Sequence, residues 1–205
     1  MKHTNCKIIG LTGGIASGKS TVSSILGSKG YYIIDSDEVA KDIVKPYEPA
    51  YHSIIKFFGT SILNEDKTIN RKKLGELVFS DVNLLQKLNQ ITHPYVFHEI
   101  RSRIAKNCSR QNIIFVDIPL LFEVYNELER HKIIFDEVWL VYVDEKTQLE
   151  RLMKRNNLNL QEAKLRIEAQ FPIEEKKKRA TRIIDNMGDI ESLIKNLNKT
   201  LDYLL

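Results

Sequence analysis

The sequence contains little cysteine and no long apolar segment. Of its 205 residues only Cys6 and Cys108 are cysteines, too few for a disulfide framework or a cysteine-based metal site. We therefore expect two reduced thiols, as in a cytosolic protein. The longest apolar runs, such as Ile113–Val116, are far shorter than the ~20 residues of a membrane span. The polar start, residues 1–6, predicts no secretory signal, so we expect a cytoplasmic protein without a membrane partner.

The composition excludes a disordered or low-complexity chain. Hydrophobic residues make up 42% and charged residues 28%, values typical of globular domains. The net charge is +4, but residues 151–182 alone hold ten cations and four anions, a surplus of six. The rest of the chain is therefore slightly acidic, and we expect a negatively charged ligand near this basic segment.

Short apolar segments alternate with helical patterns along the chain. Strands that are apolar on both faces and alternate with helices are typical of a parallel sheet covered on both sides. We therefore predict an α/β fold, a parallel five-stranded sheet with helices on both faces, in one domain of residues 1–205. The expected strands are residues 7–12, 31–34, 112–118, 137–143 and 182–184.

Two stretches are longer than this alternation requires. Residues 36–111 separate the second and third strands, whereas a complete βαβ unit needs only about 30 residues. Helical periodicity there predicts a helical insertion at about 45–110, not a loop. Within it, His93-Pro94 predicts either a kink that presents the histidine to a cleft or a histidine satisfied at a helix junction. The basic segment, about 156–181 and divided by Phe171-Pro172, predicts a mobile lid.

A glycine-rich motif follows the first strand. Residues 13–20, Gly-Gly-Ile-Ala-Ser-Gly-Lys-Ser, match G-x-x-x-x-G-K-[ST] in full, with an apolar strand before them and a helix after them. Backbone N–H groups in such a loop form an anion-binding nest, and the helix N-terminus adds partial positive charge. Lys19 suits the β- and γ-phosphates of a nucleoside triphosphate, and the Ser20 hydroxyl suits Mg²⁺. The expected nucleotide-binding residues of this segment are Gly13, Gly14, Ala16, Ser17, Gly18, Lys19, Ser20 and Thr21.

Three aspartates lie at the expected carboxyl ends of strands, where ligands bind in open α/β sheets. Asp35 and Asp37 follow the second strand, and this pair could hold Mg²⁺ or take a proton from a hydroxyl. Equally, Asp37 could cap the next helix while Asp35 is solvated. Asp117 ends the third strand, where it could act on Mg²⁺ directly or through water, or be an ordinary polar strand end.

The basic segment offers cations at helical spacing. Arg151 and Arg155 share one helix face at i and i+4, as do Arg166 and Gln170, and arginine forks suit phosphate oxygens. The run Lys176–Arg179 is either a solvated face or a nucleic-acid site. Adjoining glutamates and the lack of an aromatic stacking pattern argue against nucleic acid.

The motifs together resemble those of the bacterial dephospho-CoA kinase family. The matching pieces, in order, are Ile9–Ile15, Gly18–Thr21, Ile34–Ala40, Asn70-Arg71, Val78-Phe79, Leu88-Asn89, His93-Pro94, Asp117–Glu123 and Ile184–Asn186. The resemblance covers residues 7 to about 195, and Ala16 and Ser36 depart from the family's usual Gly and Ala. It implies a P-loop kinase-like fold with a helical CoA-binding insertion and a lid.

The resemblance also implies a reaction and roles for residues. The family transfers the γ-phosphoryl group of ATP to the ribose 3′-hydroxyl of dephospho-CoA, the last step of CoA synthesis. The expected catalytic residues are Asp37 as the base, Lys19 and Arg151. Further expected contacts are Arg151, Arg155 and Asn186 for ATP, and Ser20 with either Asp37 or Asp117 for Mg²⁺. The expected acceptor-binding residues are Asp35, Asp37, Arg71, His93, Leu120 and Glu123.

Two alternatives of different class stand beside this expectation. The first is a kinase of another small alcohol, such as a nucleoside, although the long helical insertion is large for a small acceptor. The second is a P-loop NTPase switch that responds to a protein or nucleic acid. We expect instead a monomer or weak oligomer with a small-molecule partner and no nucleic acid. ATP turnover with and without dephospho-CoA separates the three.

Overall fold

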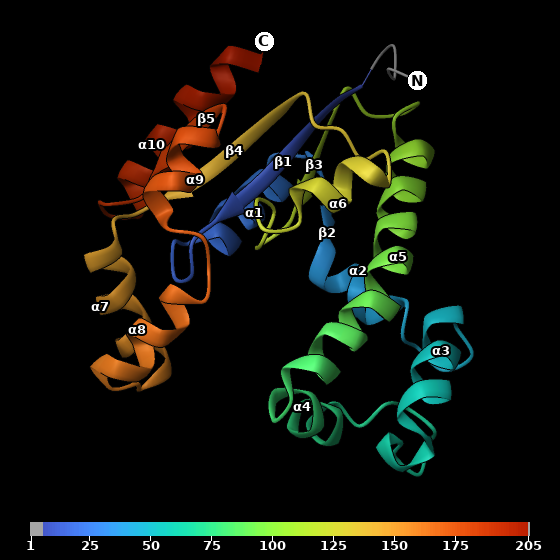
Figure 1. Cartoon of the computed structure of the whole chain (residues 1–205). Coiled ribbons are helices and arrows are strands. Elements are labelled where there is room, and N and C mark those ends of the chain that lie inside the picture. Colours follow the sequence, from blue (N-terminus) through green and yellow to red (C-terminus); the bar gives the residue numbers. More distant parts are fainter. Residues whose placement is uncertain (1–5, 205) are drawn as a thin grey trace.

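Five parallel strands form one sheet in the order β2-β3-β1-β4-β5 (Figure 1), so the predicted parallel sheet is confirmed. The computed structural model describes residues 6–204, and the polar start up to residue 5 lies outside the described residues. The strands are β1 Lys7–Gly13, β2 Tyr32–Asp35, β3 Ile113–Asp117, β4 Glu137–Tyr142 and β5 Arg182–Asp185. The register sets Asp35 beside Asp117 and Gly13 beside Val141, which brings the carboxyl ends of these strands to one edge.

Helices cover both faces of the sheet because successive strand residues point to opposite sides. On one face, Ile9 and Leu11 of β1 pack with α1 (Lys19–Ser28) and α10 (Ile190–Leu201). On the other face, Ile8 packs with α2 (Ser36–Asp42), α5 (Val82–Asn107) and α6 (Tyr125–Arg130). All six residues of β4 are buried, as expected for a strand in the middle of a sheet covered on both sides.

The residues expected to form a helical insertion do form helices. They comprise α3 (Pro49–Phe58), a 3₁₀ turn η1 (Thr60–Ile62), α4 (Arg71–Phe79) and α5. A small core of Ile54, Ile62, Leu74 and Val78 holds α3 and α4 together away from the sheet. At the base of this segment, Arg103 of α5 donates to Asp42 of α2 over 2.7 Å.

The predicted helix junction at His93-Pro94 is wrong, because one helix, α5, runs through Pro94 over 26 residues, whereas a kink within that helix stays a prediction. A proline inside a helix removes one backbone hydrogen bond and normally kinks or breaks the helix. Here the next turn of the helix buries Val96 and Phe97 in the main core, which stabilises the helical path beyond the proline. Sequence-local preferences are weak compared with such tertiary packing.

The basic segment divides into two parts with different surroundings. It follows α7 (Glu145–Asn156) and contains α8 (Leu160–Glu168) and α9 (Ile173–Arg179). Figure 1 shows α7 and α8 extending from the sheet on the opposite side from α3 and α4. By contrast, α9 lies against β4, where Ile173 packs with Leu140 and Tyr142. Of the segment predicted as a lid, about 156–181, the α9 part is therefore packed against the sheet.

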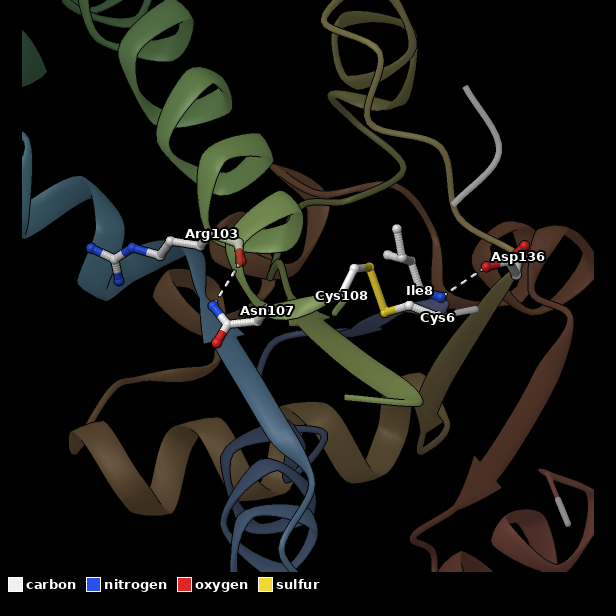
Figure 2. Close-up of a disulfide and its surroundings, with 6 residues drawn as sticks. All are labelled: Cys6, Ile8, Arg103, Asn107, Cys108 and Asp136. Atoms are coloured by element: carbon white, nitrogen blue, oxygen red, sulfur yellow. Dashed lines mark hydrogen bonds between the residues drawn. A yellow bond between two sulfur atoms is a disulfide. The ribbon is translucent and has the colours of Figure 1, made fainter. Parts of the chain in front are cut away.

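Cys6 and Cys108 are joined by a disulfide (Figure 2), so the prediction of two reduced thiols does not describe this structure. Cys6 precedes β1 and Cys108 follows the last residue of α5. Although 102 positions separate them in sequence, their Cα atoms are 5.2 Å apart. The pairing follows from topology, since β3 returns beside β1 directly after α5.

Within residues 6–204, no helix combines the length and apolar character that a membrane span requires.

Candidate active site

The phosphate loop (Gly13–Ser20) joins the end of β1 to the start of α1. Gly18, the residue that precedes α1, has a φ of 87°, and a Cβ there would lie 2.3 Å from Asn186 Nδ2, so only glycine fits without displacing the asparagine. Ala16 also has a positive φ, 60°, where the loop accepts a Cβ despite the left-handed backbone. The loop is thus shaped as an anion-binding nest at a helix N-terminus.

Side chains from the carboxyl edge of the sheet hold this loop in place. Asn186, just after β5, is buried and donates to the Ser17 carbonyl over 2.7 Å. Arg151 of α7 in turn donates to the Asn186 carbonyl over 2.9 Å. Two predicted ATP-binding residues therefore form a hydrogen-bonded chain from α7 to the phosphate loop, which fixes the loop before it meets a ligand.

Lys19 pairs with Asp117, the last residue of β3. The lysine donates a hydrogen bond to a carboxylate that is 2% exposed. Burial raises the pKa of Asp117, and the neighbouring Lys19 ammonium counteracts only part of that rise. The prediction of an ordinary polar strand end is wrong, because this carboxylate orients the cation of the phosphate loop.

The sequence offered Asp37 as a cap of the next helix and Asp35 as a solvated side chain, and the structure shows the reverse. Asp35, not Asp37, caps α2: its carboxylate accepts the Asp37 N–H at 2.7 Å and the Glu38 N–H at 3.3 Å. The Asp37 side chain is exposed and lines the cleft beside the phosphate loop. Within the described part of the chain, its carboxylate accepts no hydrogen bond. It is therefore free to accept a proton or bind a cation.

A cleft of about 1000 Å³ brings most of the predicted nucleotide site together. Its predicted lining residues are Gly13, Gly14, Ala16, Ser17, Gly18, Lys19, Ser20, Thr21, Asp37, Arg151, Arg155 and Asn186. Asp117 lies behind Lys19 instead of on the cleft wall. The residues predicted to bind the nucleotide thus line one continuous cleft, and Asp37, the expected base, lines it with them.

The predicted acceptor residues other than Asp37 lie outside this cleft. Arg71 begins α4 and is exposed, and Leu120 is 41% exposed in the loop after β3. His93 Nδ1 lies 2.9 Å from Glu127 Oε2 of α6, so the histidine is partnered on its inner side. Glu123 is half-buried: one oxygen accepts the Phe171 N–H at 3.0 Å, and the other is buried.

Several cleft residues were not predicted. They are Ile15, Pro119, Lys154, Gln170, Gly188, Asp189, Ile190 and Leu193. Lys154 adjoins the predicted Arg155, and Gln170 shares a helical spacing with Arg166, so a signal existed for both. Residues 188–193 gave no such signal, because their position depends on β5 pairing with β4.

The chain is similar to known proteins over nearly its whole length. The family model for dephospho-CoA kinase matches residues 7–192. The dephospho-CoA kinase of Carboxydothermus hydrogenoformans is 53% identical over 186 residues, 90% of this chain and 88% of the relative. The solved dephospho-CoA kinase of Campylobacter jejuni is 31% identical with a TM-score of 0.72, and 96% of each chain is covered. A shikimate kinase of Bacteroides thetaiotaomicron, 16% identical with a TM-score of 0.52 over 97% of this chain and 98% of its own, shares the fold alone. This chain belongs to the dephospho-CoA kinase family.

Proposed function

We propose that this chain transfers the γ-phosphoryl group of ATP to the ribose 3′-hydroxyl of dephospho-CoA, giving CoA and ADP. The observation that carries the proposal is the unpartnered carboxylate of Asp37 on the same cleft as the phosphate loop. Transfer to a hydroxyl needs a proton acceptor beside the reacting phosphate, and Asp37 is so placed. The choice of acceptor rests on the activity for which the relatives are named.

ATP binds with its phosphates in the loop Gly13–Ser20. Backbone N–H groups and the N-terminus of α1 supply partial positive charge there. Lys19 adds a full charge toward the β- and γ-phosphates, and Asp117 holds its side chain in the loop. Arg151 and Arg155 line the cleft from α7 and balance the remaining phosphate charge. Asn186 acts through the loop by holding the Ser17 carbonyl.

The oxygen donors beside the phosphate loop suit Mg²⁺, a hard cation. Ser20, in the first turn of α1, and Asp37 both line the cleft. Ser20 would hold the ion together with phosphate oxygens, with Asp37 or Asp117 as a further oxygen donor. When bound, the ion neutralises charge on the β- and γ-phosphates.

The chemical step requires little covalent work from the protein. The 3′-hydroxyl oxygen attacks the γ-phosphorus, its proton passes to Asp37, and the bond to the β–γ bridging oxygen breaks to release ADP. Lys19 and Arg151 stabilise the negative charge that develops on the transferred group and on ADP. Exclusion of water keeps ATP from being hydrolysed instead.

The acceptor lies on the side of the helical insertion. Arg71 at the start of α4 is an exposed cation suited to a phosphate of dephospho-CoA, and exposed Leu120 offers an apolar contact. Glu127 holds His93 through Nδ1, which leaves the other ring nitrogen for a contact with the acceptor. Asp35 contributes indirectly, because its cap of α2 fixes the position of Asp37.

The moving lid is α8 with its connections, about residues 156–169. Only Ala163 is buried in α8, whereas α9 is packed on β4 through Ile173. Closure of α8 would bring its cations toward the triphosphate and expel water from the cleft. We also propose that the enzyme works in the cytoplasm as a monomer or weak oligomer, with no nucleic acid or membrane in its reaction.

ATP turnover tests the proposal directly. ADP formation should depend strongly on dephospho-CoA, and the product should carry the new phosphate on the 3′-oxygen. A nucleoside and an unrelated alcohol serve as control acceptors. Turnover that a nucleoside supports equally would favour a different small-alcohol kinase. Turnover that ignores all acceptors, and responds to protein or nucleic acid, would favour a P-loop NTPase switch.

A further inference from the structure

The residues between α8 and α9 contact both halves of the site. Gln170 accepts the Ile15 N–H of the phosphate loop at 3.0 Å and lines the nucleotide cleft. The next residue, Phe171, donates its N–H to Glu123 at 3.0 Å. Glu123 ends the loop that follows β3, and Pro119 of that same loop lines the cleft. Two neighbouring residues thus bridge the phosphate loop and the Pro119–Glu123 loop.

A buried ion pair completes this bridge. Lys176 of α9 is 0% exposed, and its Nζ lies 2.7 Å from Glu123 Oε1. Within the described residues, Lys176 Nζ has no well-aligned hydrogen-bond acceptor, and Glu123 Oε2 has no partner. The contact is therefore held by charge more than by a hydrogen-bond network. Apolar residues of similar volume commonly stabilise a fold as well as a buried pair, so stability alone does not account for it.

Two further contacts link α9 to the same loops. A Cβ on Gly14 of the phosphate loop would lie 3.1 Å from Ile173 Cδ1, so α9 packs directly under that loop. The Arg179 guanidinium lies 5.1 Å from the Phe122 ring centre and 5.8 Å from that of Phe171. Each end of α9 thus fixes one side of the bridge.

We infer that Gln170, Glu123 and Lys176 form a brace that couples nucleotide binding to acceptor binding; the inference rests on the proposed function. They are positioning residues, because they act through the phosphate loop and the Pro119–Glu123 loop and not on the reacting atoms. When the brace is docked, both loops are held in one relative position, so a ligand that orders one loop also orders the other. This role replaces the expected direct contact of Glu123 with the acceptor.

Direct binding of two ligands to the intact enzyme measures the coupling. The dissociation constants of a non-hydrolysable ATP analogue and of dephospho-CoA are each determined alone and with the other ligand saturating. We expect each ligand to tighten the other about tenfold in the wild type, within the usual range of coupling between sites. In Lys176→Met, the unpaired Glu123 carboxylate disfavours docking, so the coupling should fall below about twofold. Each ligand alone should bind within about threefold of wild type.

Three further variants separate the brace from a general structural role. Gln170→Met removes the acceptor for the Ile15 N–H without touching the buried pair, and it should also lower the coupling. The double variant Glu123→Gln with Lys176→Met removes both charges, so the segment can dock again and much of the coupling should return. Lys178→Met is the control, because Lys178 is on the same helix but pairs with Glu175 at the surface.

The outcomes are distinct. Coupling that stays at the wild-type value in both Lys176→Met and Gln170→Met would overturn the inference, as would a wild type that binds both ligands without coupling. If Lys176→Met does not fold, Gln170→Met and the double variant decide. Failure of the wild type to bind dephospho-CoA at all would count against the proposed function and not against the brace alone.

Discussion

Lys19 donates a hydrogen bond to the Asp117 carboxylate, so the cation of the phosphate loop and the end of β3 form one pair. The pair explains why a buried carboxylate can follow four apolar residues in β3: the lysine of the phosphate loop compensates its negative charge. It also means that Lys19 contributes to the fold as well as to the phosphate binding proposed for it. Variants at either position therefore change two properties that can be measured separately.

Lys19→Met should lower kcat by about 10²–10³, because a fixed cation in such a site contributes about 3–4 kcal/mol to the transition state. It should also lower the free energy of unfolding, because Asp117 is left as a buried carboxyl without its cation. Steady-state kinetics and chemical denaturation measure the two effects. The double variant Lys19→Met with Asp117→Asn should recover stability but not activity. Near-normal kcat in Lys19→Met would contradict the assignment.

Asp37→Asn should lower kcat by about 10²–10⁴ with little change in ATP binding, because an amide cannot accept the proton of the 3′-hydroxyl. Single-turnover kinetics and binding of an ATP analogue with Mg²⁺ give the two quantities. Glu38→Gln, the exposed neighbour on α2, is the matched control. Loss of nucleotide and Mg²⁺ binding in Asp37→Asn would assign this carboxylate to the metal instead.

Amide hydrogen exchange should show protection of residues 160–168 when the ATP analogue and dephospho-CoA are both bound. The expected reason is closure of α8 over the cleft. Equal exchange with and without ligands would mean that α8 is not a lid.

Arg155→Ala should raise KM for ATP and lower kcat, because Arg155 lines that cleft. Lys146→Ala, exposed on the same helix and outside the cleft, should change neither.

Glu137→Gln should destabilise the fold in a pH-dependent way. Burial tends to raise the pKa of Glu137, but hydrogen bonds from Arg182, Lys7 and Trp139 outweigh it and lower the pKa from 4.5 to about 2. A lowered carboxyl pKa stabilises the fold fully above about pH 4.5, and the contribution is lost as the pH falls toward 2. The shift corresponds to about 3 kcal/mol at neutral pH.

Denaturation of Glu137→Gln and wild type from pH 7 to pH 2 checks this expectation. The difference in unfolding free energy between wild type and Glu137→Gln should be largest at pH 7 and should shrink as the pH falls toward 2. Glu129→Gln, an exposed carboxylate of α6, should match the wild type throughout. A difference that stays constant with pH would mean that the hydrogen bonds, and not the charge, account for the effect.

Reduction of the Cys6–Cys108 disulfide should lower the free energy of unfolding. The bond closes a loop of about 100 residues, for which the chain-entropy account gives about 5 kcal/mol, less if the unfolded state keeps structure. Denaturation midpoints with and without a thiol reductant measure the effect. A Cys6→Ser, Cys108→Ser double variant should be insensitive to the reductant. Equal midpoints for the oxidised and reduced wild type would contradict the prediction.

Local sequence patterns determined the sheet and the nucleotide side of the site. The strands are four to seven residues long with short apolar stretches, and the phosphate loop is contiguous, so local patterns located both. The residues that hold the phosphate loop but lie far from it in sequence were harder to predict. Asn186 entered only by resemblance, and its hydrogen bond to Ser17 spans 169 positions. Contacts of this kind depend on strand order, which the sequence does not state locally.

The errors have the same origin. Pairing of Cys6 with Cys108 requires that β3 lie beside β1, and the continuity of α5 through Pro94 requires the core that its next turn enters. Asp35 and Asp37 could not be told apart, because either carboxylate can cap a helix that begins one residue away. The burial of Lys176 was hidden in a run of four cations, three of which are exposed.

The ion pair between Asp42 and Arg103 gives the molecule a modular design. It joins the two points at which the chain leaves for α3 and α4 and returns along α5. Because entry and exit lie side by side, the part of this segment outside the main core, η1 and α4, can be lengthened, shortened or exchanged without separating β2 from β3. Grafting a different helical segment in place of η1 and α4 is therefore a direct way to give the same phosphate-transfer machinery a new alcohol.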